Sequence, residues 1–436
     1  MTERSQNIDE LKRAILLNRA RQRMQQQADA SHGPIPHADR KGALPLSWEQ
    51  QRLWFLDRLE PSAALAYHLP AALRLRGALD RVALRAALDR VVARHESLRT
   101  RFLDVDGEPS QSIDSAGIGF ALTEYDLTEL SADAREASLA ALRMEEARAP
   151  FDLAAGPPIR GRLLRLADDQ HALLVTQHHI VSDGWSLGVL VKEVAALYTA
   201  FSQGLPDPLP PLSIQYADYA AWQRGPDRAQ QFERSLAYWR EHLDSAPALH
   251  ELPLDRPRPA EQRFHARQHV QLLDATQLHG LSAWARERNA TLFMALQSAF
   301  AALLSRWSGQ NDIVIGTPVA GRSHAVLEPL IGFFNNTLVC RYKVTAADDA
   351  TALLAQGRSV ALDAFAHQGM PFDLLVETLR PQRSLAYNPL CQIKFVLQNH
   401  DSGELSLPNL LLQAMDPISE QVRFDLDLTA VEFEHG

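Results

Sequence analysis

The chain is poor in cysteine and has no long apolar run. Its 436 residues include two cysteines, Cys340 and Cys391, which excludes a disulfide framework, and we expect both to be buried and reduced. Apolar stretches such as residues 313–315 are far shorter than the roughly 20 residues that span a bilayer. The N-terminus also lacks an apolar signal core, so we expect a cytoplasmic protein with no membrane partner.

Blocks of basic residues and common nucleotide-binding loops are missing as well. The net charge is −9, and the absence of a Lys and Arg cluster argues against a nucleic-acid partner. There is no Walker-type phosphate loop and no glycine-rich dinucleotide turn after a strand. An ATPase and a nicotinamide enzyme therefore lose support.

The length and the pattern predict an α/β protein of two lobes, because single cores stop growing at roughly 250–300 residues. Residues 1–43 read as an amphipathic helix and a polar tether, equally well a docking element or a terminal extension. Residues 44–212 form the first lobe and 213–436 the second, with a proline-rich crossing at 204–212. We expect helices at 79–95, from 187, at 274–307 and at 349–367, and strands at 98–103, 171–181, 312–318, 337–342, 392–398 and 422–433.

The densest chemistry lies where the strand at 171–181 meets the following helix. His178 and His179 are adjacent, so on a regular strand they face opposite sides, one structural and one chemical. Asp183 and Gly184 follow at the turn, where a helix start favours negative charge. Three interpretations remain open from these residues alone: proton transfer by a histidine, a buried histidine with Asp183 as a helix cap, and metal binding, which is the weakest.

Residues 178–186 resemble the HHxxxDG motif of nonribosomal peptide synthetase condensation domains. Six further segments are similar to the other core motifs of that family, in the same order: 46–56, 94–102, 216–222, 331–337, 367–373, and 383–385 with 389–390. The resemblance covers residues 45 to about 433. Asn335, Gly369 and Asp373 depart from the residues that are usual there, which affects a pocket rather than the chemistry.

The resemblance implies two chloramphenicol-acetyltransferase-like lobes in a V, with an active-site tunnel between them. The implied reaction is amide formation, by attack of an aminoacyl carrier protein on an acyl thioester. The domain would hold no cofactor or metal of its own. It would receive phosphopantetheine arms, work with a downstream peptidyl carrier protein and an adenylation domain, and be a monomer when excised.

The resemblance also implies roles for single residues. His179 would position or deprotonate the amine, and His178 would support the turn. Asp183 would form a buried ion pair with Arg94, or else with Arg99, and the Gly184 N–H would hold the oxyanion. The predicted tunnel lining comprises Trp185, Ser186, Asn335, Asn336 and Thr337.

Three hypotheses remain for the function of the domain, and the first two differ in the acyl donor. A Met1 start with one short helix before the domain fits two kinds of donor, and of these we favour a starter domain that takes a fatty acyl group from coenzyme A or an acyl carrier. The alternative is an elongation domain that takes an L-aminoacyl or peptidyl donor from an upstream carrier protein. From a different class, the domain would be a non-catalytic platform that recruits enzymes to a carrier protein.

Overall fold

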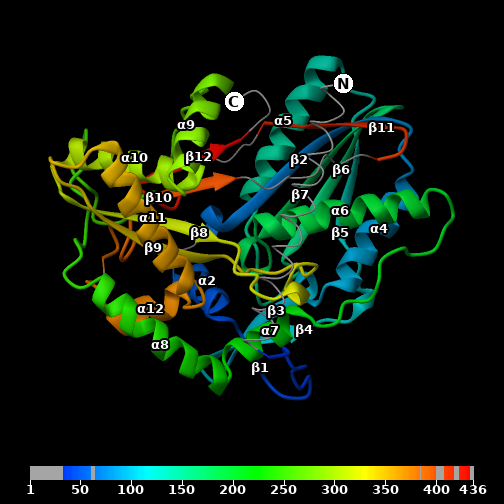
Figure 1. Cartoon of the computed structure of the whole chain (residues 1–436). Coiled ribbons are helices and arrows are strands. Elements are labelled where there is room, and N and C mark those ends of the chain that lie inside the picture. The colour runs from blue at the N-terminus through cyan, green and yellow to red at the C-terminus, as the bar shows by residue number, and fades with distance from the viewer. Residues whose placement is uncertain (1–32, 60–63, 383, 399–406, 417–421, 433–436) are drawn as a thin grey trace, which may run out of the picture.

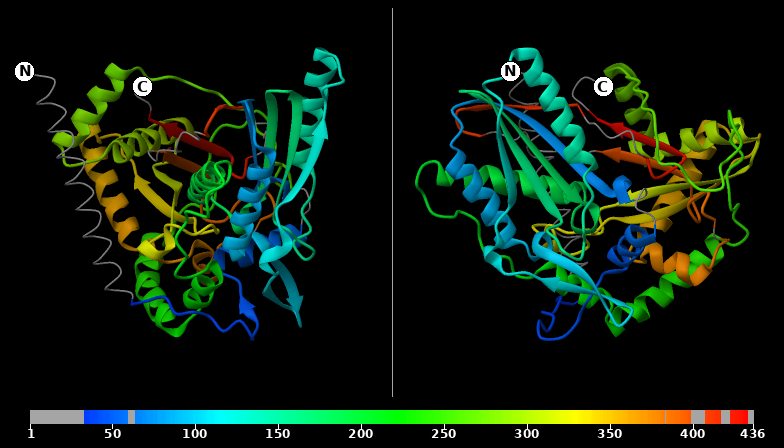
Figure 2. Two further views of the ribbon diagram at one scale, coloured as in Figure 1. Left: turned by 90° about the vertical axis from the view of Figure 1, so that its right-hand side faces the viewer. Right: turned by 180° about the vertical axis from the view of Figure 1, so that it is seen from behind.

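The computed structural model describes residues 33–59, 64–382, 384–398, 407–416 and 422–432. The helix that we expect in residues 1–30 lies outside this range. The described chain forms two main sheets, each with its own helices and its own core (Figures 1 and 2).

The first sheet has the order β11-β2-β7-β6-β5. Its strands are β2 (His68–Gly77), β5 (Ala121–Asp126), β6 (Ile159–Ala167), β7 (Gln170–His178) and β11 (Leu410–Ala414). Successive residues of β7 point to opposite faces, so Leu173 packs with α4 (Arg81–Arg94) and α6 (Gly184–Phe201), and Leu174 packs with α5 (Ala132–Arg148). Helices on both faces bury this sheet, and its strand end carries the histidine pair.

The second sheet has the order β12-β10-β8-β9. Its strands are β8 (Asp312–Val319), β9 (Asn336–Lys343), β10 (Ile393–Gln398) and β12 (Leu426–Val431). The helices of this half are α8 (Pro226–His242), α9 (Ala275–Glu287), α10 (Leu292–Ser308), α11 (Ala350–Ala366) and α12 (Phe372–Leu379). Phe300 of α10, Val360 of α11 and Phe395 of β10 share one buried cluster, which is the core of the second lobe.

The single helix predicted over 274–307 is wrong, because the chain breaks between α9 and α10. Asn289 has a positive φ of 56°, which an α-helix does not accommodate. The Thr291 side chain then accepts the N–H of Met294 at 3.3 Å and caps a new helix.

The division at residue 212 describes most of the chain but fails for β11. This strand comes from the C-terminal half, yet it pairs antiparallel with β2, with Leu410 opposite Gly77 (Figure 1). Gly77 has a φ of 125°, and a Cβ there would lie 2.1 Å from the carbonyl oxygen of Asn409. The sheet of the first lobe is therefore completed by the second.

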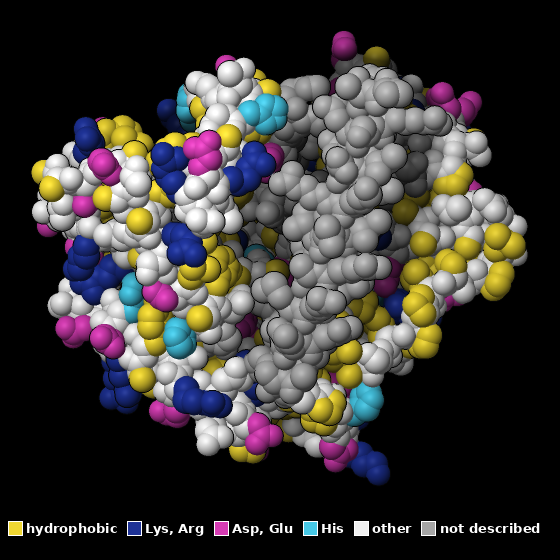
Figure 3. Space-filling model, in the orientation of Figure 1, with side chains coloured by type: hydrophobic (Ala, Val, Ile, Leu, Met, Phe, Trp, Pro, Cys, Tyr) yellow, Lys and Arg dark blue, Asp and Glu magenta, His cyan; other side chains and the backbone are white. Residues whose placement is uncertain are grey.

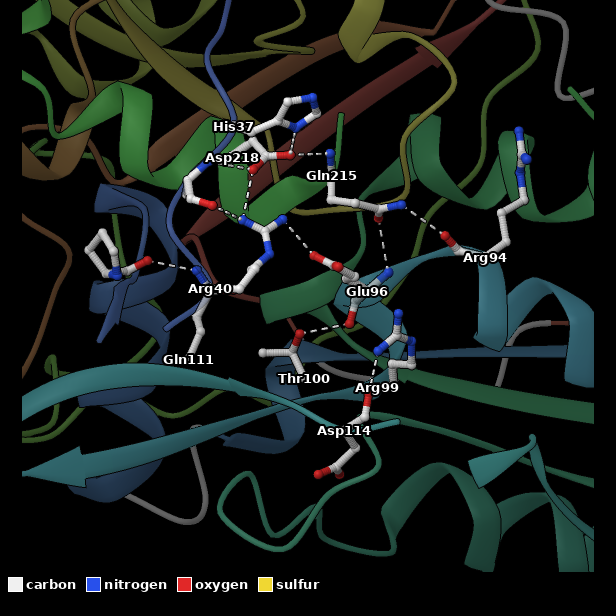
Figure 4. Close-up of polar contacts among 12 residues, drawn as sticks. His37, Arg40, Arg94, Glu96, Arg99, Thr100, Gln111, Asp114, Gln215 and Asp218 are labelled. Carbon is white, nitrogen blue, oxygen red and sulfur yellow. Dashed lines mark hydrogen bonds and ion pairs between the residues drawn. The ribbon is translucent and has the colours of Figure 1, made fainter. Parts of the chain in front are cut away.

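The lobe junction holds α2 (Trp48–Leu59), α7 (Tyr216–Gln223) and a small sheet of β1 (Leu44–Pro45), β3 (Thr100–Val105) and β4 (Glu108–Ile113). The predicted tether is docked here where it is described. Ile35 is buried, and Arg40 pairs with Glu96 at 2.8 Å and Asp218 at 2.7 Å (Figure 4). Residues 35–40 therefore belong to the folded domain.

The surface charges and the two cysteines do not mark a functional site. On the face in Figure 3, Lys and Arg side chains lie interspersed with Asp and Glu. Within the described part of the chain, no helix has the length and apolarity of a membrane span, and no three His, Cys, Asp or Glu side chains gather as a metal site would need. Cys340 and Cys391 are buried and unbonded, and burial raises the pKa of each thiol to about 12.

Candidate active site

The turn after β7 places the two histidines in different surroundings. β7 ends at His178, and residues His179–Val181 form a single 3-10 turn rather than the end of the predicted strand. Ser182 and Asp183 are extended, and α6 begins at Gly184. The chain thus reverses tightly at the junction of the lobes.

His178 serves the turn itself. Its Nδ1 accepts the backbone N–H of Ile180 at 3.1 Å, so the ring proton sits on Nε2, which lies 3.8 Å from Asp57 Oδ1. The rings of His68 and Phe151 meet it edge to face. Burial holds the pKa of His178 well below its usual range, so this side chain is a neutral structural group.

His179 offers a free lone pair. Its Nδ1 lies 2.6 Å from the carbonyl oxygen of Ser182, and because a carbonyl can only accept, Nδ1 carries the proton. Nε2 is then an acceptor, and it has no hydrogen-bond partner within the described ranges. The Phe333 ring packs edge to face against the imidazole at 4.7 Å. Burial, then the charges of Arg423 and Lys394, lower the pKa of His179 to about 3.

Asp183 caps α6 and ties the lobes together. One oxygen accepts the N–H of Ser186 at 2.7 Å and lies 3.4 Å from the guanidinium of Arg322. The other accepts the N–H of Phe334 at 3.0 Å. The cap that the sequence left open is confirmed, and the ion-pair partner is Arg322.

The predicted pairing of Asp183 with Arg94 or Arg99 is wrong. Arg94 ends α4 where that helix packs on α6, and its Nε donates to Glu193 at 2.9 Å. Arg99 points the other way and donates to the carbonyl of Asp114 (Figure 4). Both arginines stabilise the first lobe and not the catalytic turn.

Residues 331–334, here named the junction loop, are held almost entirely by side chains from the N-terminal half. Five side chains bond six of its backbone groups: His95, Ser97, Ser186, Tyr216 and Asp183. A Cβ on Gly332 would lie 1.9 Å from the Tyr216 ring, so glycine is required there. This loop fixes Phe333 against His179.

Two of the predicted tunnel residues are structural. Ser186 is fully buried, where its hydroxyl donates to the carbonyl of Gly332 at 2.8 Å and accepts from Arg322 at 2.8 Å. Residues 184–188 do match the Gly-x-Ser-x-Gly pattern of hydrolases, but this buried, bonded serine is no exposed nucleophile. Asn336 donates to the carbonyls of Gln368 and Met370 at 2.9 and 2.7 Å.

The other predicted lining residues are more open. Asn335 and Thr337 are partly exposed, and Trp185 is 38% exposed, with its indole N–H donating to the carbonyl of Glu328 at 2.9 Å. Their place in a tunnel stays a prediction. A cavity of about 510 Å³ lies at the ends of β8 and β10, but no residue of the catalytic turn lines it.

Gly184 stands open at the start of α6. It is exposed, its φ is not positive, and a Cβ would meet nothing within 4 Å, so the fold itself does not require glycine. Its N–H is the first of the helix and has no partner among the described residues. A developing negative charge is favoured at such a place.

Sequence reasoning missed Arg322, Phe333, Lys394 and Arg423. They lie between 139 and 244 residues from Asp183 or His179 along the chain. Phe333 stood inside a segment that had been recognised, so the motif order was a signal for it. The three cations carried no local pattern that pointed to the histidine.

Comparison with known proteins agrees with this architecture. The profile of the condensation domain matches residues 40–436. Malpibaldin synthetase of Mortierella alpina is 45% identical over 93% of this chain, and one component of the linear gramicidin synthase of Brevibacillus parabrevis is 45% identical over 92%. The chain spans only 7% and 5% of those proteins.

Solved structures show the same fold. The X-domain from teicoplanin biosynthesis is 31% identical, with a TM-score of 0.83 over 92% of this chain and 88% of that one. The starter condensation domain of rhizomide synthetase RzmA, at 22% identity, has a TM-score of 0.75 over 89% of this chain and 85% of that one. The predicted α/β fold is confirmed. The chain belongs to the family of nonribosomal peptide synthetase condensation domains, and these domains are amide-bond-forming acyltransferases.

Proposed function

We propose that this domain forms an amide bond at His179 between an acceptor amine on a carrier protein and a carrier-bound donor thioester. The observation that supports this most directly is the geometry of His179. Its Nδ1 proton is committed to the carbonyl of Ser182, which leaves Nε2 as a fixed, unpartnered acceptor. Nε2 can therefore accept a hydrogen bond from the attacking amine.

The reaction needs one bond made and one broken. The amine donates an N–H to Nε2 of His179 while its nitrogen attacks the thioester carbon. The C–N bond forms, the C–S bond breaks, and the departing thiolate takes the proton that the nitrogen loses. Because the pKa of His179 is about 3, full protonation of the imidazole is unfavourable. We therefore assign His179 mainly an orienting role.

The residues around it divide the remaining tasks. The free N–H of Gly184 is suited to hold the oxyanion of the tetrahedral intermediate, a contact of the kind that contributes about 10²–10³ in rate. Asp183 and His178 act indirectly, since each fixes the backbone of the turn. Arms of phosphopantetheine would present both substrates, with a downstream carrier protein and adenylation domain as partners.

For the donor, an aminoacyl or peptidyl group on an upstream carrier protein is favoured over fatty acyl-CoA. Two further components of linear gramicidin synthase are 44% and 42% identical to this chain, so these relatives work within a synthase of several polypeptides. The starter condensation domains are 22–23% identical, and their likeness supports the fold alone. The starter donor that the sequence favoured stays a prediction.

A recruitment platform is the second candidate, because the teicoplanin X-domain is known in complex with OxyB and is 31% identical to this chain. The intact Nε2 acceptor of His179 and the open Gly184 N–H favour catalysis instead.

Amide formation followed by mass spectrometry tests the proposal. Aminoacyl carrier protein acceptors are combined with aminoacyl carrier donors and, separately, with octanoyl-CoA. We expect product with carrier donors, its loss in His179→Ala, and its retention in His279→Ala, which changes an exposed histidine. Product with octanoyl-CoA alone would restore the starter donor. No product in any combination, with carrier binding intact, would favour the platform.

A further inference from the structure

The segments 46–56 and 216–222 resemble family motifs but carry none of the residues of the catalytic turn. At the start of the first, Ser47 and Gln50 are both fully buried. The Ser47 N–H donates to Oε1 of Gln50 at 3.1 Å, and the Gln50 N–H donates to the Ser47 hydroxyl oxygen at 3.1 Å. This reciprocal pair is a capping box, which fixes both side chains at the start of α2.

Gln50 reaches the catalytic turn directly. Its Nε2 donates to the carbonyl oxygen of Ile180 at 3.2 Å, and Ile180 directly follows His179 in the 3-10 turn. The orientation of the amide is determined, because the Ile180 carbonyl can only accept and the Ser47 N–H can only donate. The bond therefore fixes the backbone that carries His179.

Ser47 reaches the junction loop through Tyr216, which is also buried. The Tyr216 hydroxyl donates to the carbonyl oxygen of Phe333 at 2.6 Å, and its oxygen lies 2.9 Å from the Ser47 hydroxyl oxygen. Because the one proton of Tyr216 goes to Phe333, Ser47 is the donor to Tyr216. Burial holds the pKa of Tyr216 well above its usual range, so the hydroxyl keeps its proton. The three residues form a directed chain of hydrogen bonds.

The two sets of contacts meet at the imidazole of His179. Its Nδ1–H is bonded to the carbonyl of Ser182 within the turn that Gln50 holds. The ring of Phe333, whose carbonyl Tyr216 holds, packs edge to face against the imidazole at 4.7 Å. Together they set the direction in which Nε2 points. A misplacement of about 1 Å between reacting groups can cost about 10² in rate.

We propose that Gln50 and Tyr216 are positioning residues for amide formation. Gln50 holds the backbone of the catalytic turn, and Tyr216, which Ser47 holds in its turn, keeps the Phe333 ring against the imidazole. Both act through their neighbours and not by contact with substrate. This inference rests on the proposed function, because it requires His179 to orient the attacking amine.

Tyr216→Phe tests the chain, because it removes the hydroxyl and keeps the ring that packs on Gly332. We expect kcat for amide formation between carrier-bound substrates to fall about tenfold, with KM within twofold, since binding surfaces are unchanged. Tyr219→Phe is the matched control. Tyr219 is buried on the same helix, but its hydroxyl accepts from Gln223 at 3.1 Å, so kcat should stay within twofold of the wild type.

A double variant shows whether Tyr216 acts through Phe333. If it does, the hydroxyl has nothing to position once the ring is gone, so Tyr216→Phe/Phe333→Leu should lower kcat no more than twofold below Phe333→Leu alone. Independent effects would multiply instead, which predicts a further fall of about tenfold. A role confined to stability predicts a lower unfolding midpoint with kcat unchanged.

Gln50→Met tests the second contact, and it decides the matter if Tyr216→Phe does not fold. Methionine has a similar length but cannot donate to the Ile180 carbonyl. We expect kcat to fall about tenfold with KM within twofold. Gln51→Met is the control, because this neighbouring glutamine of α2 bonds Arg224 and not the turn, and its kcat should stay within twofold of the wild type.

The outcomes are distinct. Unchanged kcat in both Tyr216→Phe and Gln50→Met, losses of equal size in their controls, or a multiplied loss in the double variant overturns the positioning role. Turnover in the wild type and none in His179→Ala would still leave the proposed function standing. Absence of amide product with every donor in the wild type overturns both. Urea unfolding of each variant confirms that folded enzymes are compared.

Discussion

A buried carboxylate at the lobe junction makes the stability of this domain depend on pH. Glu49 of α2 is 4% exposed, and both its oxygens accept from the side-chain amide of Gln223 at 3.0 Å. No Lys or Arg of the described chain forms an ion pair with it within 4 Å. Burial raises the pKa of Glu49 from 4.5 to about 7. The charged form therefore opposes folding.

The sign follows from proton binding. The folded state holds this proton up to about pH 7 and the unfolded state loses it near 4.5, so stability is full below pH 4.5 and falls as the pH rises to 7. A rise of this size in pKa corresponds to a loss of about 3 kcal/mol in the free energy of unfolding between low and high pH. Glu49→Gln removes the charge at nearly constant shape. We expect the free energy of unfolding of the variant to exceed that of the wild type by up to about 3 kcal/mol at pH 8.5 and to equal it near pH 4.5.

Urea unfolding at several pH values measures this difference, with the midpoint and slope compared at each pH. Glu287→Gln, at a side chain that is 72% exposed, is the matched control and should follow the wild type at every pH. A Glu49→Gln variant that loses stability with pH as the wild type does would refute the reasoning, as would one that is less stable at pH 8.5.

Three further substitutions test the site. Asp183→Asn leaves Arg322 buried without its charge partner, so we expect a loss of about 3–5 kcal/mol in urea unfolding, and an unchanged midpoint would contradict this. Gly184→Ala should leave the unfolding midpoint unchanged, because its Cβ meets nothing, yet slow turnover at least tenfold if substrate approaches there; full activity would remove Gly184 from the site. Phe333→Leu should lower kcat more than it raises KM, since the ring orients His179; a loss confined to KM would argue against that contact.

The local part of the site could be predicted from the sequence. A strand, two histidines, a capping aspartate and a glycine at a helix start are read from neighbours, and the structure places them within one turn. The assignment of His179 as the chemical residue still came from family resemblance. Spacing alone had left a structural histidine equally open, and His178 proves to be one.

The long-range part could not be predicted. Arg322 lies 139 residues from Asp183, and Arg94, which seemed nearer in the motifs, is drawn instead to Glu193 where α4 meets α6. A helix pattern ran unbroken through Asn289, but its positive φ ends α9. The pairing of β11 with β2 brings Asn409 against Gly77, a contact between residues 332 positions apart that no local pattern indicates.

The junction loop has a mechanical consequence. Five of its six bonded backbone groups are held by side chains of the first lobe and the sixth by Tyr216 of α7, so these four residues are anchored to that lobe although they belong to the second half of the chain. The imidazole of His179 and the ring of Phe333 are therefore held on one and the same body, so a shift of the second lobe would not by itself separate them.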